Sequence, residues 1–433
     1  MPAIRLLARV PAMVRRDYLV TAAAHWLTLA SGLLLFHLVA RRAGVAGFAY
    51  YQVARGMVST VQPLALVGLV SALHRYLPRA GRRIRVLARQ AFLLEVVLLN
   101  VVGLATVALA ENVGRLFGIG GAPEVRAAVV LTAGVCLCTV AMAALRGCGQ
   151  VGLSIVASLI GFGLLPLAAF AVTDRMPVFL TLQGVAMAAL ASGAVVAAGP
   201  RNVERRATPR PAPPLRTLLR YGLRRTPGDV ALPGLFAFPT FFVAGTSHSA
   251  AEAGYIGFAT SAITLICAVF LMLNPVLLPR LSGHAHEAEA AGRTFGAELA
   301  HGLRVLPFAA AGVAALASAV LLVVATPVVR WFLGAEFAGA DTVIRFGAPV
   351  SIPLAMFYAA RPTIDALREA PVTTVLLVGS LAIEVVATCA AALVLPAWQA
   401  ALAGFGAGAV VLAASSYVAM LRAIPVPASR STP

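Results

Sequence analysis

The sequence predicts an all-α, polytopic membrane protein with about 12 transmembrane helices in two six-helix lobes. Two observations predict this class. Hydrophobic residues make up 60% of the 433 residues and charged residues only 12%, a balance that soluble globular domains do not show. The apolar residues also gather in runs of about 20, the length that a helix needs to cross a ~30 Å hydrocarbon core.

Six apolar runs of this length precede a basic, proline-rich stretch, and six follow it. No soluble segment between them is long enough for a folded catalytic domain, which disfavours a membrane-anchored enzyme. The predicted spans are 18–40, 48–73, 91–110, 127–146, 151–172, 177–198, 227–247, 254–278, 303–325, 343–361, 372–395 and 398–421.

The stretch at residues 199–226 divides the chain, and it contains eight arginines and five prolines. Proline-rich segments are extended and positive charge favours the cytoplasmic side of a membrane. A semi-extended cytoplasmic linker is therefore predicted here. It separates an N-terminal lobe, residues 1–198, from a C-terminal lobe, residues 227–422, which is followed by a cytoplasmic tail at 423–433.

The distribution of arginine predicts the orientation. If the N-terminus is inside, 26 of the 34 basic residues fall in cytoplasmic segments and 7 in outer ones, with Arg55 inside a span. The positive-inside rule then places both termini in the cytoplasm. The basic residues are all arginine, which indicates a GC-rich bacterial genome, so the expected location is a bacterial inner (plasma) membrane. The same rule accounts for the net charge of +18 without a nucleic-acid partner.

Cysteine and histidine predict neither a disulfide nor a metal site. The cysteines all fall in or at the end of apolar runs and form no CxxC pair, so they are interpreted as small buried hydrophobes. They are Cys136, Cys138, Cys148, Cys267 and Cys389.

The second span carries a polar stripe. Gln52, Arg55, Ser59 and Gln62 stand at i, i+3, i+7 and i+10, which is one face of a helix. An arginine fork matches phosphate oxygens, and amides and hydroxyls suit sugar hydroxyls. The alternative is that Arg55 extends along its stem to the membrane surface.

Other polar residues in the spans are weaker candidates for the same binding site. Span one has Thr21, His25 and Thr28 at i, i+4 and i+7. Asn274, near the end of span eight, is either a substrate-binding donor or a helix-packing amide. Glu95 in span three is near enough to the cytoplasmic end to reach the headgroups.

Glu384 lies near the middle of span eleven, on one face with Thr373, Ser380 and Thr388. An ionised carboxylate at this depth is costly, so it binds a cation, carries a proton or pairs with an arginine. Asp229, at the start of span seven, is a second acidic candidate, although its spacing also fits a helix cap.

Four short segments resemble one family. They are Gly44-Val-Ala-Gly-Phe-Ala-Tyr50, Leu73-His-Arg-Tyr-Leu-Pro-Arg79, Asn274-Pro-Val-Leu-Leu-Pro-Arg280 and Arg330-Trp-Phe-Leu-Gly-Ala-Glu-Phe337. In these segments and in their order along the sequence, the chain resembles the superfamily of multidrug, oligosaccharidyl-lipid and polysaccharide exporters. Within this superfamily it resembles the O-antigen and exopolysaccharide flippases.

The resemblance implies two six-helix lobes around a central cavity, which rock to give alternating access, with spans one, two, seven and eight lining the cavity. It also implies a site for a coupling ion, Na⁺ or H⁺, in the second lobe, and no other cofactor. Carried over, that site would consist of Glu384, Ser380 and Asp229. The alternative for Glu384 is a salt bridge with Arg55, whose depth is similar.

The function predicted from these features is that of a flippase for a lipid-linked saccharide. Membrane lipids would surround it, and envelope-assembly proteins are possible partners. Three alternatives remain: a multidrug exporter of the same superfamily, an envelope polysaccharide polymerase or glycosyltransferase, and a structural scaffold. The enzyme alternative requires catalytic residues on a sizeable outer loop, which the sequence does not provide.

Overall fold

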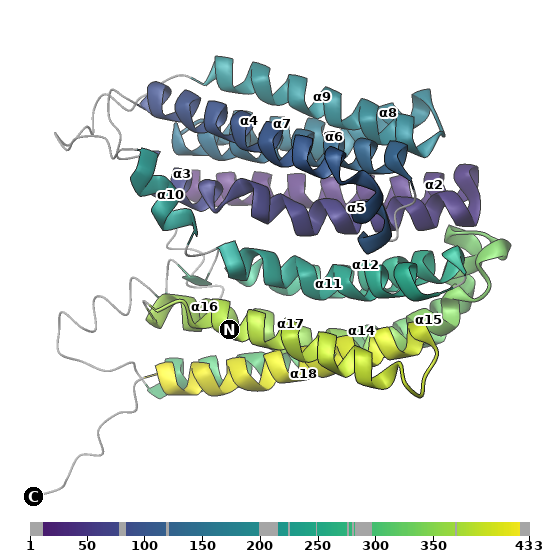
Figure 1. The fold of residues 1–433 in the computed structure, drawn as a ribbon. Helices are drawn as coiled ribbons and strands as arrows, with labels where there is room; N and C mark the ends of the chain where they lie inside the picture. The colour runs from purple at the N-terminus through teal and green to yellow at the C-terminus, as the bar shows by residue number, and fades with distance from the viewer. Residues whose placement is uncertain are drawn as a thin grey trace, which may run out of the picture. The chain divides into compact units, whose positions relative to one another are not determined.

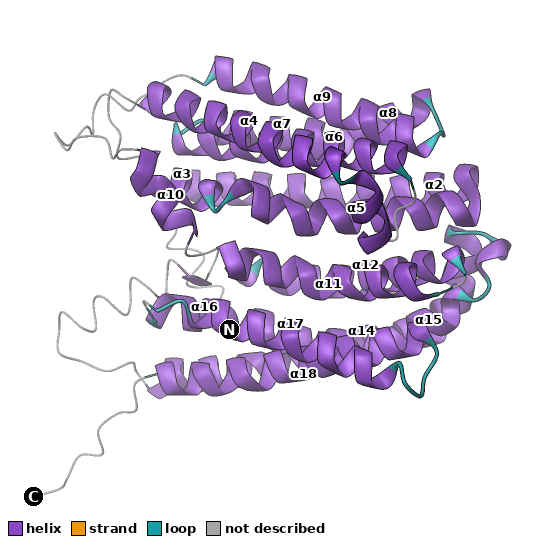
Figure 2. Ribbon diagram, viewed as in Figure 1, coloured by secondary structure: helices purple, strands orange, loops and turns teal. Residues whose placement is uncertain are grey.

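The described part of the chain is helical. The computed structural model describes residues 12–77, 84–117, 121–198, 215–223, 226–247, 249–274, 277–278, 281, 297–368 and 370–424. Within these ranges it contains helices joined by turns and no β-strand (Figure 1, Figure 2). Most of the predicted linker and of the C-terminal tail lies outside the described residues. The predicted all-α class is confirmed.

The contacts among the helices define two compact units. Unit 1 comprises Met1–Phe48 and Val61–Thr226, and unit 2 comprises Ala49–Thr60 and Pro227–Pro433. Residues 49–60 thus precede the linker in sequence but pack with the second half of the chain.

The first helix, α2 (Ala12–Leu66), supplies two of the predicted spans. Its apolar part has 44 residues, which at 1.5 Å per residue is about 66 Å, or twice a ~30 Å hydrocarbon core. Gly44 interrupts it with φ 65° and ψ −169°, a conformation that is open to glycine because it has no Cβ. The described residues contain 11 apolar helices long enough to cross a membrane, and because α2 supplies two crossings they account for the 12 that are predicted.

Unit 1 is built around α6 (Ala122–Gly147), which packs against α4 (Ile84–Ala108) and α9 (Met176–Ala197). Gly134 and Gly184 allow α6 and α9 to approach closely, since a Cβ at Gly134 would lie 2.8 Å from the Gly184 carbonyl carbon. Small residues commonly have this role between membrane helices. The other elements are α3 (Leu69–Tyr76), α5 (Ala110–Phe117), α7 (Val151–Ser158), the π-helix η3 (Leu159–Leu164), α8 (Leu165–Val172) and α10 (Leu215–Leu223).

The last described part of the linker is helical, so the prediction of a semi-extended segment is wrong there. Helix α10 begins directly after the run of prolines ends at Pro214. Leu218 is fully buried, and a Cβ at Gly222 would lie 2.9 Å from the carbonyl carbon of Gly68, the residue before α3. The sequence of α10 is amphipathic, so burial of its apolar face against α3 stabilises the helix more than hydration would stabilise an extended segment.

In unit 2, α18 (Ala397–Ala423) packs against α17 (Val372–Ala391) and α16 (Ser351–Leu367). Gly404 and Gly408 of α18 lie directly against the backbone of α17. The other elements are α11 (Thr226–Thr246), α12 (Ala250–Leu271), α14 (Ala297–Phe332), η5 (Ala335–Phe337), α15 (Ala340–Gly347) and η6 (Ala348–Val350).

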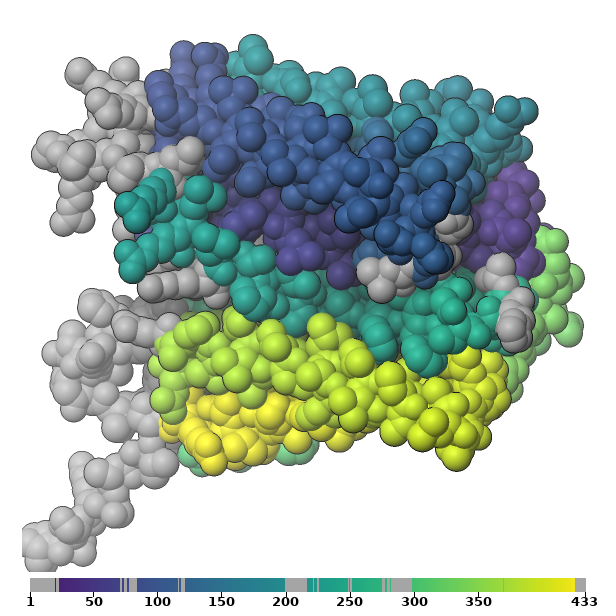
Figure 3. Space-filling model, viewed as in Figure 1, coloured from purple at the N-terminus to yellow at the C-terminus, as the bar shows by residue number. Residues whose placement is uncertain are grey.

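Large apolar side chains are exposed along the helices. Leu104 of α4 is 71% exposed and Val386 of α17 is 69% exposed, and both helices form part of the surface of their unit in Figure 3. Such surfaces are unfavourable in water, whereas lipid tails are as apolar as leucine. The chain is therefore a multi-pass membrane protein.

Candidate functional site

Unit 2 contains a cavity of about 260 Å³. Its walls come from residues 49–60 of α2 and from α11, α12 and α16. Because ligand pockets usually start at about 300 Å³, this volume suits a small polar group rather than a whole lipid-linked molecule. The lining residues are Gln52, Arg55, Gly56, Ser59, Leu232, Pro233, Phe236, Ala237, Thr240, Gly257, Thr260, Ser261, Thr264 and Tyr358.

Arg55 provides the positive charge of this cavity. Its Nη1 donates to Ser261 Oγ at 3.0 Å, and Ser261 Oγ donates to the Gly257 carbonyl at 2.7 Å. None of the described lining residues is acidic. A guanidinium offers a planar fork of N–H donors that matches phosphate oxygens, so the cavity favours an anion.

The other polar groups of the cavity are one amide and several hydroxyls. Gln52 is only 4% exposed, and its Nε2 has no hydrogen-bond partner among the described residues. Ser59, Thr260 and Thr264 donate to helix carbonyls at 2.8, 3.1 and 2.8 Å. Their oxygens keep lone pairs as acceptors, while the unpartnered Gln52 donor is costly unless a ligand satisfies it.

Two glycines of α12 explain why residues 49–60 pack in unit 2. A Cβ at Gly257 would lie 2.6 Å from Cβ of Gln52, and one at Gly254 would lie 3.1 Å from Cα of Ala49. Any larger side chain at either position would force the two helices apart. The glycines thus bring the polar stripe of α2 onto the hydroxyl groups of α12.

The other predicted substrate-binding residues lie elsewhere. Gln62 Nε2 donates to Thr139 Oγ1 at 3.0 Å within unit 1. His25 is half-buried in unit 1, where the hydroxyl of Thr28 donates to a backbone carbonyl one turn earlier at 2.9 Å. The Oδ1 of Asn274 is buried without a described partner and does not line the cavity. Three of the seven predicted residues are therefore brought together.

A second polar cluster lies between α17 and α18. Thr373, Ser380, Glu384 and Thr388 are all at most 6% exposed, so they share the buried face that their spacing predicts. Both carboxyl oxygens of Glu384 lack a described hydrogen-bond partner, as do the hydroxyls of Ser380, Thr388 and Ser416 of α18. Because a buried charge must be paired or neutralised, this carboxyl is suited to carry a proton or to bind a cation.

Two charged residues, Asp229 and Arg55, were each considered as a partner of Glu384, and neither is beside it. Asp229 is exposed in the first turn of α11, and a Cβ at its neighbour Gly228 would lie 3.1 Å from Cα of Thr374. Thr374 precedes Glu384 by ten residues, which is about 15 Å along α17. Since neither Glu384 oxygen has a partner among the described residues, the alternative salt bridge with Arg55 is wrong.

Two further features were missed or misjudged from the sequence. Glu95 is fully buried and its carboxyl oxygens have no described partner, so the expectation that it reaches the headgroups is wrong. The cavity also contains hydroxyls whose spacing on α12 is a helical signal that could have been used. On α12 they are Thr260, Ser261 and Thr264, and the cavity has two further hydroxyls in Thr240 of α11 and Tyr358 of α16.

The chain matches no protein-family model, and no curated protein sequence matches it. Among solved structures it is similar to an inward-facing multidrug resistance MATE family transporter of the MOP superfamily, with a TM-score of 0.71 and 16% identity over 94% of this chain and 98% of that one. It is also similar to the lipid II flippase MurJ in an inward closed conformation (TM-score 0.69, 12% identity, 93% and 87% covered). An outward-facing MATE structure gives a TM-score of 0.63 at 14% identity, with 96% of each chain covered. The chain has the fold of the MOP-superfamily transporters, which confirms the resemblance at this level.

Proposed function

We propose that this protein is a transporter, not an enzyme, and that it moves a lipid-linked oligosaccharide or cell-envelope polysaccharide precursor from the inner to the outer leaflet by alternating access. The observation that carries the proposal is the cavity of unit 2, which is lined by a guanidinium, an unpartnered amide donor and hydroxyls, and by no described carboxylate. A phosphate-linked sugar presents the complementary anionic and hydroxyl oxygens. The similarity to the flippase MurJ supports it.

The role of Arg55 can be tested in vesicles that contain the purified protein and a fluorescent polyprenyl-pyrophosphate-linked sugar. Arg55→Ala removes a charge-assisted hydrogen bond of about 1.5–3 kcal/mol, so the flipping rate should fall about 10- to 150-fold. Arg55→Lys retains the charge without the fork and should lose less, whereas Arg55→Glu should lose most. Arg330→Ala, an exposed arginine outside the cavity, is the matched control. Full transport by Arg55→Glu would exclude the proposed role.

The coupling site of the proposed transporter is the buried cluster around Glu384. Its carboxyl and the hydroxyls of Ser380 and Thr388 are oxygen ligands of the kind that hard cations prefer, and the carboxyl alone is sufficient to carry a proton. Asp229 follows Gly228, which packs against Thr374, and Thr374 is about 15 Å from Glu384 along α17. This distance argues against the inclusion of Asp229 in the site. The coupling ion is Na⁺ or H⁺, with no other cofactor.

A multidrug exporter is the second candidate function. It is favoured by the similarity to the multidrug resistance MATE transporter and by the buried acidic residue Glu384. A cationic dye would meet Arg55 in the cavity, which disfavours its binding by charge repulsion. Efflux of ethidium from vesicles, lost in Glu384→Gln and faster in Arg55→Gln, would support this candidate over the flippase.

The proposed site of action is the inner membrane of a bacterium, with both termini in the cytoplasm. The arginine distribution supports this orientation. Envelope-assembly proteins are proposed partners, since the product of such a flippase must be passed to the enzymes that extend or attach the saccharide.

A further inference from the structure

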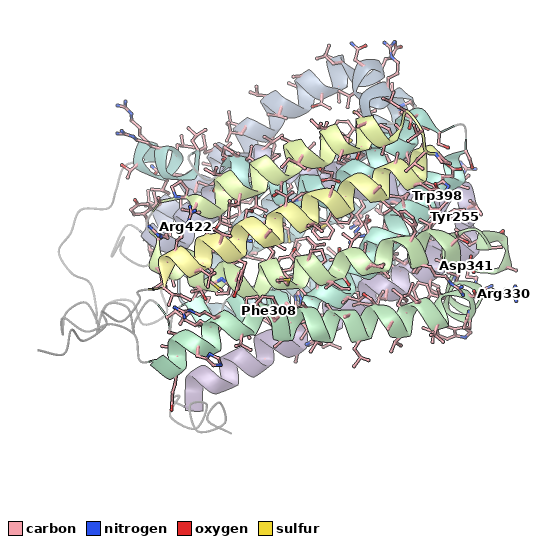
Figure 4. The ribbon with its side chains drawn as sticks, turned by 90° about the horizontal axis from the view of Figure 1, so that it is seen from below. Tyr255, Phe308, Arg330, Asp341, Trp398 and Arg422 are labelled. Atoms are coloured by element: carbon pink, nitrogen blue, oxygen red, sulfur yellow. The ribbon has the colours of Figure 1, made fainter. Side chains whose placement is uncertain are left out.

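Unit 2 has a second concave site, which shares no lining residue with the polar cavity. It is a groove of about 630 Å³ between α17 and α18. Figure 4 shows Arg422 at one end of unit 2, with Tyr255, Arg330, Asp341 and Trp398 at the opposite end. The lining residues that matter here are two arginines, Arg368 and Arg422, and four apolar side chains, Val372, Leu376, Val411 and Val418.

The two arginines make one end of the groove positive. Arg368 follows the end of α16, and its Nη2 donates to the backbone carbonyl of Arg422 at 2.6 Å. Both side chains are exposed, and no described lining residue is acidic. The nearby carboxylate of Asp365 is engaged by Arg361 at 3.3 Å and by the hydroxyl of Thr373 at 2.6 Å. A groove with two cations and no lining anion attracts negative charge.

The groove has the length of one membrane leaflet. Trp398 and Arg422 are 24 residues apart, about 36 Å along α18, so a ~30 Å hydrocarbon core lies between them. Tryptophan prefers the membrane interface, and Arg422 therefore lies at the level of the opposite headgroups. Val411 is 11 residues before Arg422, about 16 Å deeper, which is about half of the ~30 Å core.

We propose that this groove binds an anionic phospholipid, with the phosphate between Arg368 and Arg422 and an acyl chain along Val372, Leu376, Val411 and Val418. Basic pockets between membrane helices are known to bind lipid headgroups. The apolar length of the groove favours a lipid over a free phosphate ion. The lack of an acidic lining residue favours an anionic headgroup over a zwitterionic one, whose cation would meet the arginines. The proposal does not depend on what the protein transports.

Native mass spectrometry of the purified full-length protein, titrated with phosphatidylglycerol or phosphatidylcholine, tests the charged end. Arg368→Gln and Arg422→Gln should each weaken phosphatidylglycerol binding about fivefold, which corresponds to about 1 kcal/mol for each arginine near the surface. Arg330→Gln, at the opposite end of unit 2 (Figure 4), should leave it unchanged. Arg422→Gln keeps the backbone carbonyl that Arg368 contacts, so its fold should be retained. Equal phosphatidylglycerol affinities of the wild type and of the variants Arg368→Gln, Arg422→Gln and Arg330→Gln would overturn the proposal.

A second pair of variants tests the apolar part without changing charge. Ser415 lines the groove, and Ser415→Trp should fill it and abolish phosphatidylglycerol binding. Val410→Trp places the same indole on an exposed neighbour that does not line the groove and should have no effect. Inorganic phosphate at millimolar concentration should not compete. Full competition by phosphate, or unaltered binding in Ser415→Trp, would indicate a simple anion site and overturn the proposal. Exclusive binding of a polyprenyl phosphate would also overturn it.

Discussion

One methyl group at Gly257 should destabilise the protein. The added Cβ of Gly257→Ala would lie 2.6 Å from Cβ and 2.9 Å from Cγ of Gln52, whereas carbon atoms pack at about 3.5–4.0 Å. The α12 helix and residues 49–60 must therefore separate by about 1 Å. Overpacking of this kind costs about 1–3 kcal/mol, and the better helix propensity of alanine offsets up to ~1 kcal/mol of it. The apparent melting temperature in detergent should fall by about 1–3 °C, since the unfolding entropy of a chain of 433 residues is roughly 0.9 kcal/mol/K.

The same change should impair transport, because Ser261 lies one turn beyond Gly257 and holds Arg55 at 3.0 Å. A displacement of about 1 Å at a binding group can cost about 100-fold in rate. Gly312→Ala is the control, since nothing lies within 4 Å of a Cβ there; it should retain both stability and transport. If Gly257→Ala behaves like Gly312→Ala in the melting and vesicle assays, the proposed packing of α2 on α12 is refuted.

The remaining predictions concern charge and orientation. Glu384→Gln should leave the protein folded but remove the dependence of transport on a Na⁺ or pH gradient; normal gradient dependence would exclude the coupling role. Arg55→Gln combined with Glu384→Gln should lower the flipping rate by the product of the single effects, because the two residues do not pair; partial recovery in the double variant would contradict this. Glu95→Gln should match or exceed the wild-type melting temperature, since an amide cannot ionise and a buried carboxylate without a partner is costly, and a clear decrease would point to a partner outside the described residues. In a cysteine-free background, an impermeant maleimide added from outside should label Ser249→Cys and not Leu223→Cys, and the reverse pattern would overturn the orientation.

Local periodicity was sufficient to predict the spans and the buried face of α17. A membrane helix satisfies its own backbone hydrogen bonds, so a long apolar run forms a helix whatever its neighbours are. The spacing of Thr373, Ser380, Glu384 and Thr388 determines a shared face around one axis, and all four are buried. The extent of a span and the buried face of its helix depend on the residues of that helix only, so both can be predicted from a single sequence.

The identity of the packing partners could not be predicted in this way. At about 100° per residue, Gln62 lies about 80° around the helix from Gln52, at the edge of the stripe. It bonds to Thr139 within unit 1, whereas Arg55 bonds to Ser261 within unit 2. The division of one stripe between two units depends on close contacts such as that of Gly257, which involve residues about 200 positions apart.

Unit 2 contains two opposite charges that do not neutralise each other. Arg55 lines a cavity beside neutral hydroxyls, while Glu384 is enclosed so tightly that a Cβ at Gly408 would lie 2.9 Å from its Cβ. A buried pair of these two would be strongly destabilised by the loss of either partner, by about 3–5 kcal/mol, and a ligand would have to compete with that attraction. Because the two do not pair, the guanidinium stays in the wall of the cavity, and the carboxyl can take up or release a proton without breaking an ion pair. Arg55 and Glu384 lie at similar depths in their predicted spans, which is why the sequence allowed a salt bridge. In the structure Arg55 packs with α12 and Glu384 packs against α18, so the two side chains do not pair. This separation agrees with the proposal of distinct substrate and coupling sites.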